Sequence, residues 1–384
     1  MQLPVYLDNH ATTPLDPRVL DAMLPFLKKD FGNASSTDHK FGTTAAAAVE
    51  EARDSVAKLI GASPEEIVFT SGATESDNLA IRGFVEAHGR DDAHIIASTI
   101  EHRAVLDSAG YLQRLGVQVS YVPVDRLARV SVKSLRDTMT DKTALVSVML
   151  ANNEVGTVQQ LAELSKMAHD RGAIIHTDAA QAVGHIPVNV DELGVDLMSI
   201  SAHKINGPKG VGALYTRRRG GRVRLSPQLM GGGQERGLRS GTLNVPGIVG
   251  MGKALSLASS ELRKERNHLA KLRDELELTI AALGEVEVNG NRASRLPHNL
   301  NVRIAGVDGK ALIGACAKEV AFSASSACST QVVEPSHVLL AMGLTPAEAH
   351  QCVRLALGRF TTEEEISFAG ESIAHAIRRL RRLS

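Results

Sequence analysis

Apolar residues between positions 65 and 217 recur in short runs that are separated by amphipathic stretches. The short runs include "IVFT", "HIIAS", "ALVSVML" and "AIIHT", and longer stretches with helical spacing, such as "QQLAELSKMAHDRG", lie between them. Buried strands that alternate with helices are typical of a mostly parallel sheet covered on both faces. The pattern therefore predicts an α/β fold, in which functional side chains collect at the carboxyl ends of strands.

A different pattern follows the glycine-rich segment "LMGGGQERGLRSGT". A run rich in Leu, Ala, Glu, Lys and Arg predicts one long helix from residue 246 to about 283, and "HNLNVRIAG" predicts a strand beyond it. We therefore expect a large domain at 16–261, and a small α+β domain formed by 1–15 and 262–384.

The last helix begins at a predicted capping box, in which Thr362 is followed three residues later by Glu365. The basic ending "RRLRR" could mark a tail that binds membrane or nucleic acid. A helix that packs on the core, with cations near its C-terminus, explains the same residues and is favoured.

Composition excludes several classes of function. The 384 residues are 43% hydrophobic and 22% charged, which is ordinary for a globular protein. The 43 basic and 43 acidic residues balance, and aromatic content is only 3%, so we expect no direct binding of nucleic acid. The start of the chain has no signal-peptide pattern, and no apolar run approaches the length of a membrane span.

Three cysteines without a C-x-x-C pair predict neither a disulfide framework nor a thiolate zinc site. The 14 histidines show no ligand spacing, so no resident metal is expected. Unpaired cysteines favour a reduced, cytoplasmic setting.

The segment "SISAHKINGPKG" contains the first candidate site. Ser201, His203 and Lys204 follow an apolar strand and precede a turn whose glycines let the backbone approach a ligand. A lone lysine is usually a solvated surface residue. Here, burial near other cations would lower the pKa of Lys204 and free its amine for a Schiff base.

Other strand ends carry polar residues with two possible roles each. Asp178, followed by Gln181, either caps the next helix or pairs with the protonated ring nitrogen that pyridoxal phosphate needs. Thr74 lies in "FTSGATESDN", where a helix start could cradle a phosphate. His102 follows another strand and could be structural or functional.

Together and in this order, these motifs resemble one family, the pyridoxal-phosphate-dependent cysteine desulfurases of the NifS/IscS-like branch of the class V aminotransferases. The resemblance runs along the whole chain, from "YLDNHATTPLDPRV" through "EHRAVL", "HTDAAQAVG" and "SAHKINGPKG" to "SSACST" and "RLALGRFTTEEE". It implies a fold type I transferase whose large domain has a mostly parallel seven-stranded sheet. It also implies conversion of L-cysteine to L-alanine with transfer of the sulfur.

The resemblance implies a role for each cofactor residue. Lys204 forms the Schiff base and is the base at Cα, Asp178 holds the pyridine nitrogen protonated, and Gln181 bonds the ring hydroxyl. His102 stacks on the ring and moves protons. The implied phosphate ligands are Ala73, Thr74, Ser201, His203 and, from the neighbouring subunit of a homodimer, Thr242.

Arg354 resembles the arginine that clamps the substrate carboxylate, a contact that suits a guanidinium fork. Asn153 and Asn33 are predicted to assist it. Arg359 is given no catalytic role.

Cys328, in "ASSACST", stands in a stretch of Ser and Ala without apolar periodicity. By the resemblance, its thiolate attacks the substrate sulfur, because no hydrolytic step removes that sulfur as a persulfide. We expect a long, flexible loop at about 323–335 that passes sulfur to several acceptors without an obligatory activator. Cys328 can also ligate an iron–sulfur cluster transiently with an acceptor. Cys316 and Cys352 lie on helical patterns and are expected in the core.

The chain departs from the family in two places. Asn206 follows "HKI", where relatives often carry an aromatic residue or His, and the chain stops at "RRLRRLS", without the extra segment that docks a scaffold protein in some relatives. The acceptor therefore stays open between iron–sulfur assembly and thio-modification of tRNA or DNA. The alternative functions are a cysteine lyase or aminotransferase that shares the cofactor, and a non-catalytic sulfur carrier.

Overall fold

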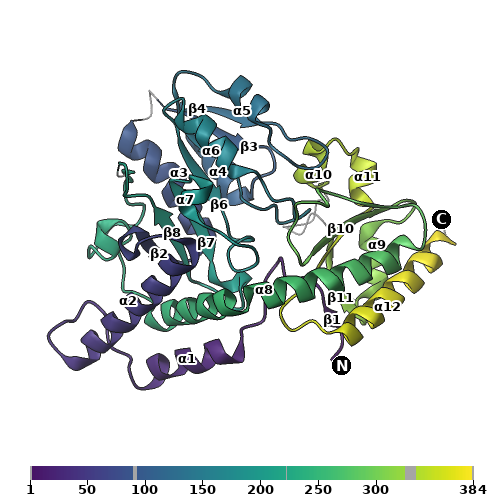
Figure 1. Cartoon of the computed structure of the whole chain (residues 1–384), viewed down its shortest axis with the longest axis horizontal. Helices are drawn as coiled ribbons and strands as arrows, with labels where there is room; N and C mark the ends of the chain where they lie inside the picture. The colour runs from purple at the N-terminus through teal and green to yellow at the C-terminus, as the bar shows by residue number, and fades with distance from the viewer. Residues whose placement is uncertain (1, 90–92, 222, 325–333, 383–384) are drawn as a thin grey trace.

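A computed structural model describes residues 2–89, 93–221, 223–324 and 334–382 (Figure 1). The large domain is built on a seven-stranded sheet, as the sequence predicts. Its strands, in spatial order, are β2 (Ile67–Thr70), β8 (Gly212–Thr216), β7 (Leu197–Ser201), β6 (Ile174–Asp178), β5 (Thr143–Ser147), β3 (His94–Ser98) and β4 (Gln118–Val122). All neighbouring pairs are parallel except those that β8 makes with β2 and β7.

Helices cover both faces of this sheet, and most residues of its strands other than β4 are buried. One face packs on α3 (Ala73–His88) and α4 (Arg103–Arg114). The other face packs on α2 (Lys40–Ile60), α6 (Leu161–His169) and the first half of α8 (Val245–Ala281). The remaining helices of this domain are α1 (Pro17–Lys28), α5 (Val132–Thr138) and α7 (Val190–Leu193).

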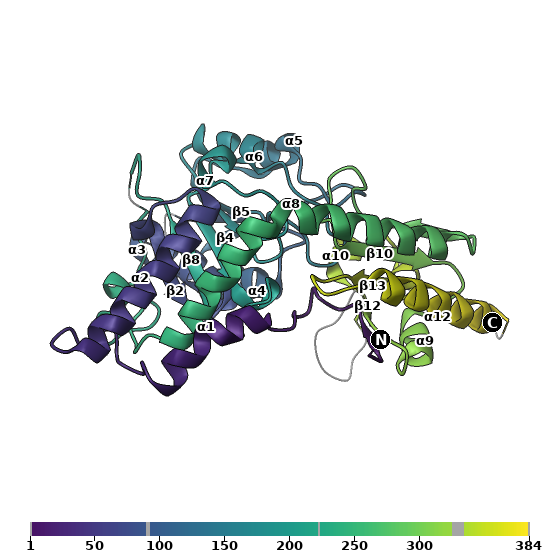
Figure 2. The ribbon, with the colours of Figure 1, turned by 60° about the horizontal axis from the view of Figure 1, so that its bottom comes forward.

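The small domain has a four-stranded antiparallel sheet in the order β12 (Ser323–Ala324), β13 (Cys352–Ala356), β10 (Asn299–Ile304) and β9 (Val286–Val288). The N-terminal strand β1 (Val5–Tyr6) pairs in parallel with β11 (Val320–Ala321), so the start of the chain belongs to this end of the molecule (Figure 2). The helices here are α9 (Gly309–Cys316), α10 (His337–Ala341), α11 (Pro346–His350) and α12 (Glu363–Arg381).

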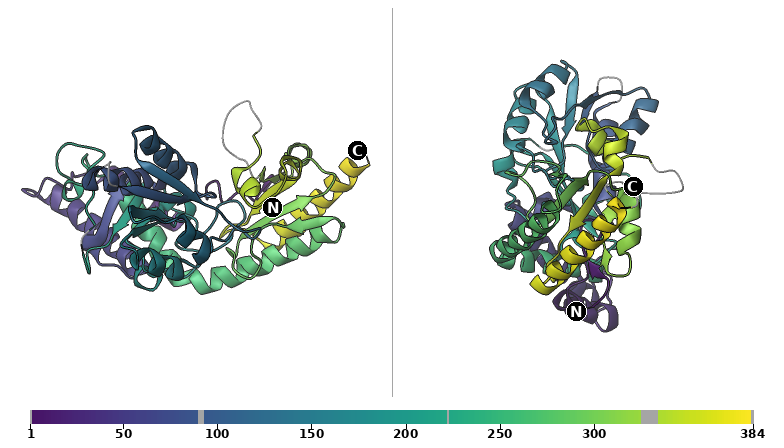
Figure 3. Two further views of the ribbon diagram at one scale, coloured as in Figure 1. Left: turned by 90° about the horizontal axis from the view of Figure 1, so that it is seen from above. Right: turned by 90° about the vertical axis from the view of Figure 1, so that its right-hand side faces the viewer.

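Helix α8 joins the two parts as one continuous rod (Figure 3). Its first half buries Met251 and Leu255 in the core of the large domain, and its second half buries Leu272 and Leu276 in the core of the small domain. The long helix predicted from the sequence is confirmed to within two residues at each end. The predicted domain boundary at 261/262 falls inside it.

The C-terminal helix α12 starts at the predicted capping box: the Thr362 amide donates to the Glu365 carboxylate at 2.9 Å, and the Glu365 amide donates to Thr362 Oγ1 at 3.2 Å. Ile366, Ile373 and Ile377 are buried in the small-domain core, which confirms that the helix packs on the protein. Among the described residues, no helix is long and apolar enough to cross a membrane.

One prediction about the cysteines is wrong in part. Cys316 ends α9 and is buried, as expected, but Cys352 begins strand β13 rather than lying in a helix. Helix α11 stops at His350, and the five strand residues after Gln351 are all buried. A continuously buried strand has no alternation that would separate it from a buried helix.

A buried ion pair attaches the glycine-rich segment to the large domain. The Arg53 guanidinium of α2 donates to both carboxylate oxygens of Glu235 at 2.8 Å, and the Phe69 amide of β2 donates to the same carboxylate at 2.7 Å. Glu235 has φ 48°, a left-handed conformation that a side chain disfavours. The ion pair therefore holds a strained turn against the end of the sheet.

We predict that Glu235→Gln lowers the free energy of unfolding by about 3 kcal/mol, because it leaves a buried guanidinium without its main counter-charge. Urea unfolding measures the change. The matched control is Lys133→Ala, which removes the exposed Lys133–Asp137 pair and should leave the free energy of unfolding almost unchanged, because solvent screens such a pair. Equal losses in the two variants would contradict the prediction.

Candidate active site

A cleft of about 1260 Å³ opens between the carboxyl ends of the parallel strands and the small domain. The cleft brings together most of the residues predicted from the sequence: Ala73, Thr74, His102, Asn153, Asp178, Gln181, Ser201, His203, Lys204 and Arg354. Asn33 and Thr242 are exposed and do not line this cleft. Cys328 lies outside the described residues, whereas Glu334 to Ser336, which follow its segment, line the cleft.

Lys204 ends a short 3₁₀ turn that follows β7 directly, which places its amine at the end of the sheet. Its Nζ donates to the carbonyl oxygens of His10 and, at 2.9 Å, of Ala11. The neighbouring His203 contacts Thr12 Oγ1 at 3.1 Å through Nδ1, and burial together with Lys204 lowers its pKa to about 4. His203 is therefore a neutral ring beside the Lys204 amine.

The turn between β2 and α3 forms one wall of the cleft. Helix α3 begins at Ala73, directly after Gly72, and its first amides face the end of the sheet where Thr74 lies. A Cβ atom on Gly212 of β8 would lie 2.6 Å from Gly72 Cα, so only glycine lets this turn rest on the sheet. The N-terminus of a sixteen-residue helix is suited to an anionic group.

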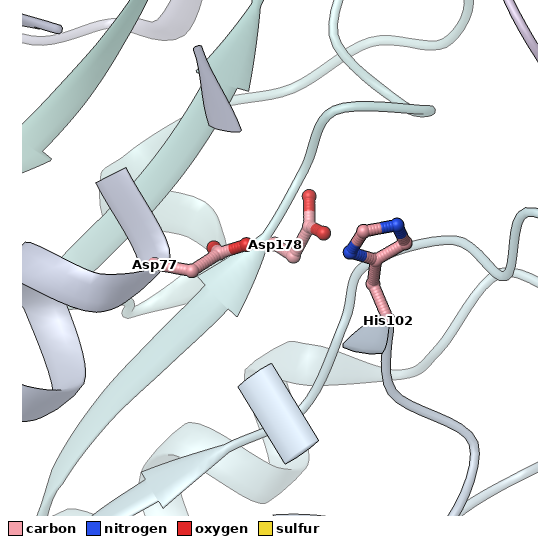
Figure 4. A group of neighbouring side chains, drawn as sticks. All are labelled: Asp77, His102 and Asp178. Carbon is pink, nitrogen blue, oxygen red and sulfur yellow. The ribbon is translucent and has the colours of Figure 1, made fainter. Parts of the chain in front are cut away.

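Asp178, at the end of β6, lies between Asp77 of α3 and His102 (Figure 4). One ligand atom from each of the three residues lies within 4.8 Å of the others. Burial raises the pKa of Asp178, while the nearby His102 and Lys204 act in the opposite direction. Both neighbours thus favour the charged form of a carboxyl group that burial would neutralise.

The interpretation of Asp178 as a helix cap is wrong. Its Oδ1 accepts the Ala180 amide at 2.8 Å in a turn, and the next helix, α7, begins only at Val190. His102 is the residue that caps a helix, since its Nδ1 accepts the Ala104 amide of α4 at 3.1 Å. This bond fixes the orientation of a ring that also faces the cleft.

Asp77 and Glu101 are buried acids that sequence reasoning missed. Burial and then the Asp178 charge raise the pKa of Asp77 well above its ordinary range, although Ser199 acts in the opposite direction. The nearest ring nitrogen, His176 Nε2, lies 3.5 Å from Asp77 Oδ1. Burial likewise raises the pKa of Glu101 to about 8, although the Met149 amide donates to it at 2.7 Å. Three carboxyl groups at this depth cannot all be charged. Neutral Asp77 is also a poor metal ligand.

Arg354 reaches the cleft from β13 and is nearly buried, with 4% of its side chain exposed. Its Nη2 donates to Asp8 at 2.8 Å and to Ser323 Oγ at 3.0 Å, and its Nη1 donates to the Asn153 carbonyl at 3.0 Å. Its Nε has no partner within the described part of the chain. Asp8 and Ser323 thus orient the guanidinium, and two of its five N–H groups, the one on Nε and the second one on Nη1, have no partner among the described residues.

Glu154 is a further buried acid in the lining of the cleft. It accepts the Ser336 hydroxyl at 2.5 Å, and burial raises its pKa to about 7. Asp8 and Glu154 both fall inside quoted motifs, "YLDNHATTP" and "NNEVG". Their contacts with Arg354 and Ser336 span hundreds of residues, so local sequence gave no sign of them.

We predict that Glu101→Gln removes a pH-dependent loss of stability. The folded protein releases the Glu101 proton near pH 8, whereas the unfolded chain releases it near 4.5, so stability falls as pH rises through this window. The variant should gain over the parent protein by up to about 1.4 kcal/mol per pH unit inside the window. Urea unfolding at both ends of the window measures this gain, and a pH-independent difference would contradict it.

Comparisons with known proteins agree with this geometry. The family model described as aminotransferase class-V matches residues 5–368. The cysteine desulfurase IscS of Rickettsia bellii (strain OSU 85-389) is 48% identical over 383 residues, which cover 100% of this chain and 93% of that protein. The cysteine desulfurase IscS of Anaeromyxobacter dehalogenans (strain 2CP-C) is 50% identical over 385 residues, covering 100% and 95%.

Solved structures give the same result. A NifS-like protein superposes with a TM-score of 0.90 and 40% identity, covering 97% of this chain and 99% of that one. DndA from Streptomyces lividans superposes with a TM-score of 0.76 and 39% identity, covering 91% and 99%. The chain therefore belongs to the aminotransferase class-V family, in the group that contains the curated cysteine desulfurases.

Proposed function

We propose that this protein is a cysteine desulfurase, which converts L-cysteine and a protein thiol into L-alanine and a protein persulfide. One observation carries the proposal. A lysine amine, a buried carboxyl group and an oriented arginine face a single cleft, and residues 334–336, which follow the segment that contains Cys328 in the sequence, line it. Full-length relatives with 48% and 50% identity that are named cysteine desulfurases support it.

The cofactor that family membership implies is pyridoxal 5′-phosphate, and the residues present fit it. The amine of Lys204 suits the aldehyde, and Asp178, whose charge His102 and Lys204 favour, suits a protonated ring nitrogen. The start of α3, with Thr74, Ser201 and His203 in the same cleft lining, suits the phosphate. When bound, the cofactor supplies the electron sink that labilises the Cβ–S bond of the substrate.

The residues of the chain then have separate tasks. Lys204 Nζ, held beside the His10 and Ala11 carbonyl oxygens, accepts the proton from substrate Cα. His102, fixed by its bond to the Ala104 amide, faces the same space and moves protons. Arg354 binds the substrate carboxylate through its guanidinium, whose Nε–H has no partner among the described residues, with Asn153 beside it.

We propose that Cys328 is the thiol that takes the sulfur. It lies four residues after Ala324, and an extended chain of that length spans at most about 14 Å. Ser323, just before the segment, bonds to Asp8 and Arg354, and Ser336, just after it, bonds to Glu154. Both ends of the segment are thereby tied to the wall of the cleft.

The transfer step balances without an added oxidant. The Cys328 thiolate attacks the substrate sulfur, an S–S bond forms as the Cβ–S bond breaks, and the electron pair left on Cβ takes a proton. L-Alanine and a Cys328 persulfide result. Sulfur-acceptor proteins then collect the outer sulfur atom for iron–sulfur assembly or for thio-modification of tRNA or DNA.

We also propose a homodimer in a compartment that keeps thiols reduced, since Cys328 must return to the thiol after each transfer. Thr242 is exposed on the glycine-rich segment, as a residue that serves a neighbouring subunit must be. Leu229 and Met230 on the same segment expose 44% and 85% of their surface, which is apolar area that a second copy would cover.

We predict that purified protein incubated with L-cysteine, without reductant, forms alanine and one extra sulfur atom on Cys328. Mass spectrometry of the peptides locates that sulfur. Cys328→Ser should lower alanine formation by at least about a hundredfold, because no hydroxyl replaces a thiolate as the sulfur nucleophile.

The matched control is Cys316→Ser. Burial raises the pKa of the Cys316 thiol to about 11, so this cysteine should carry no persulfide and its loss should leave turnover unchanged. Pyruvate and free sulfide with unmodified Cys328 would identify a lyase. Protein that binds no pyridoxal phosphate and forms no product would identify a non-catalytic carrier.

We predict that Arg354→Lys raises the KM for L-cysteine by about tenfold to a hundredfold, because an ammonium group cannot make the bidentate contact of a guanidinium. Steady-state alanine formation measures KM and kcat. Arg359→Lys is the control, since Arg359 pairs with Asp16 and Glu265 and does not line the cleft. An equal rise in KM in both variants would remove Arg354 from substrate binding.

A further inference from the structure

Three buried histidine rings lie against one another where the N-terminal segment, the large domain and the small domain meet. The ring centroids of His10 and His298 are 4.6 Å apart, and those of His185 and His298 are 4.1 Å apart. His185 lies in the segment between β6 and α7, and His298 immediately precedes β10. The proposed reaction uses none of these imidazoles.

Of these three histidines, His10 alone is bonded through both ring nitrogens to side chains of the described residues. Its Nδ1 lies 2.7 Å from Gln181 Oε1, and its Nε2 lies 3.0 Å from Asn299 Nδ2. All three side chains are buried, and Gln181, which is 6% exposed, also lines the cleft. The bonds form a chain from the small-domain strand β10 to the wall of the active site.

The direction of every bond in this chain is fixed, because backbone carbonyl groups stand at both ends. Asn299 Nδ2 also donates to the Glu154 carbonyl at 3.1 Å, so it is the amide nitrogen and His10 Nε2 must accept. The His10 proton is therefore on Nδ1 and is donated to Gln181 Oε1. At the other end, Gln181 Nε2 donates to the His10 carbonyl at 3.1 Å.

The imidazole of His10 also stays uncharged. Burial and then the charge of Arg354 hold its pKa well below the ordinary range, and Lys204 and His185 act in the same direction. His298, whose ring packs against it at a tilt of 33°, also has a lowered pKa, chiefly because of burial. A second proton on His10 would reverse the bond to Asn299, and its surroundings oppose that protonation.

We propose that His10 is a positioning residue, which holds the amide of Gln181 so that the second N–H of Gln181 donates to the ring hydroxyl of the cofactor. The inference rests on the proposed function, because that hydroxyl belongs to pyridoxal phosphate. Without the His10 donor, the amide can turn over and present its oxygen to another oxygen. His10 acts only through Gln181.

Two substitutions separate the two nitrogens of His10. His10→Asn places an amide near the Nδ1 position, where it can still donate to Gln181, whereas His10→Gln places its amide near the Nε2 position and loses that donor. Apo protein titrated with pyridoxal phosphate gives the affinity, and the pH dependence of the visible absorption band gives the state of the ring oxygen.

H10Q should weaken cofactor binding about tenfold, the effect of one lost hydrogen bond to a charged oxygen, and move the absorption transition to higher pH. H10N should retain most of the affinity. The matched control is His298→Asn, which alters the same cluster of rings without touching Gln181. The affinity of this variant for pyridoxal phosphate should stay within about twofold of the parent value, because Nδ1 of His298 has no partner among the described residues. Thermal unfolding of each apo variant shows that it folds.

A double variant tests whether the effect passes through Gln181. In a Gln181→Ala background, H10Q should cause no further loss of affinity. Equal affinities for H10N and H10Q, or an additive effect in the double variant, would overturn the inference about His10. The proposed function would remain intact if the same proteins bound the cofactor and formed alanine normally. Parent protein that binds no pyridoxal phosphate would overturn the proposed function instead.

Discussion

Charge in the floor of the cleft is the constraint on which the rest of the site depends. Asp178 stands at the end of a buried strand, with Asp77 behind it and Glu101 nearby, and water reaches none of the three freely. One negative charge is tolerable there because Lys204 and His102 lie beside it, but two or three are not. Asp77 stays neutral because burial raises its pKa, and His176 stays neutral because burial lowers its pKa to about 3. The single negative charge therefore stays on Asp178. The α/β scaffold supplies this depth, since its strands are covered by helices on both faces.

Arg354 shows how the two domains share one site. Its strand belongs to the small domain, its partner Asp8 belongs to the N-terminal segment, and it also donates to the backbone of Asn153 in the large domain. The continuous helix α8 holds these parts at a fixed separation, because half of it is buried in each core. The position of a substrate carboxylate relative to Lys204 is therefore set by the packing of the whole molecule.

The sequence predicted the fold class, the long helix and the capping box of α12, because each of these has a local signal in apolar period or cap residues. It also identified the motifs whose side chains meet in the cleft, since they follow strands that end at one edge of the sheet. It missed Asp77, which looks like an ordinary polar residue of a helix, and it assigned Cys352 to a helix. Both depend on burial, which tertiary packing decides. The roles of Asp8, His10 and Glu154 rest on partners far along the chain, which no local pattern can reveal.

Strand β1 has a consequence for synthesis of the protein. Val5 and Tyr6 leave the ribosome long before Val320 and Ala321, with which they pair, and Asp8 reaches Arg354 only when that residue has been made. The carbonyl oxygens of His10 and Ala11, which accept hydrogen bonds from the Lys204 amine, lie on the same N-terminal segment, which cannot pair until the small domain has been made. A nascent chain can build the large sheet early and still lack a finished cleft until almost its last helix. Incomplete translation products would thus carry the reactive lysine without the walls that direct it.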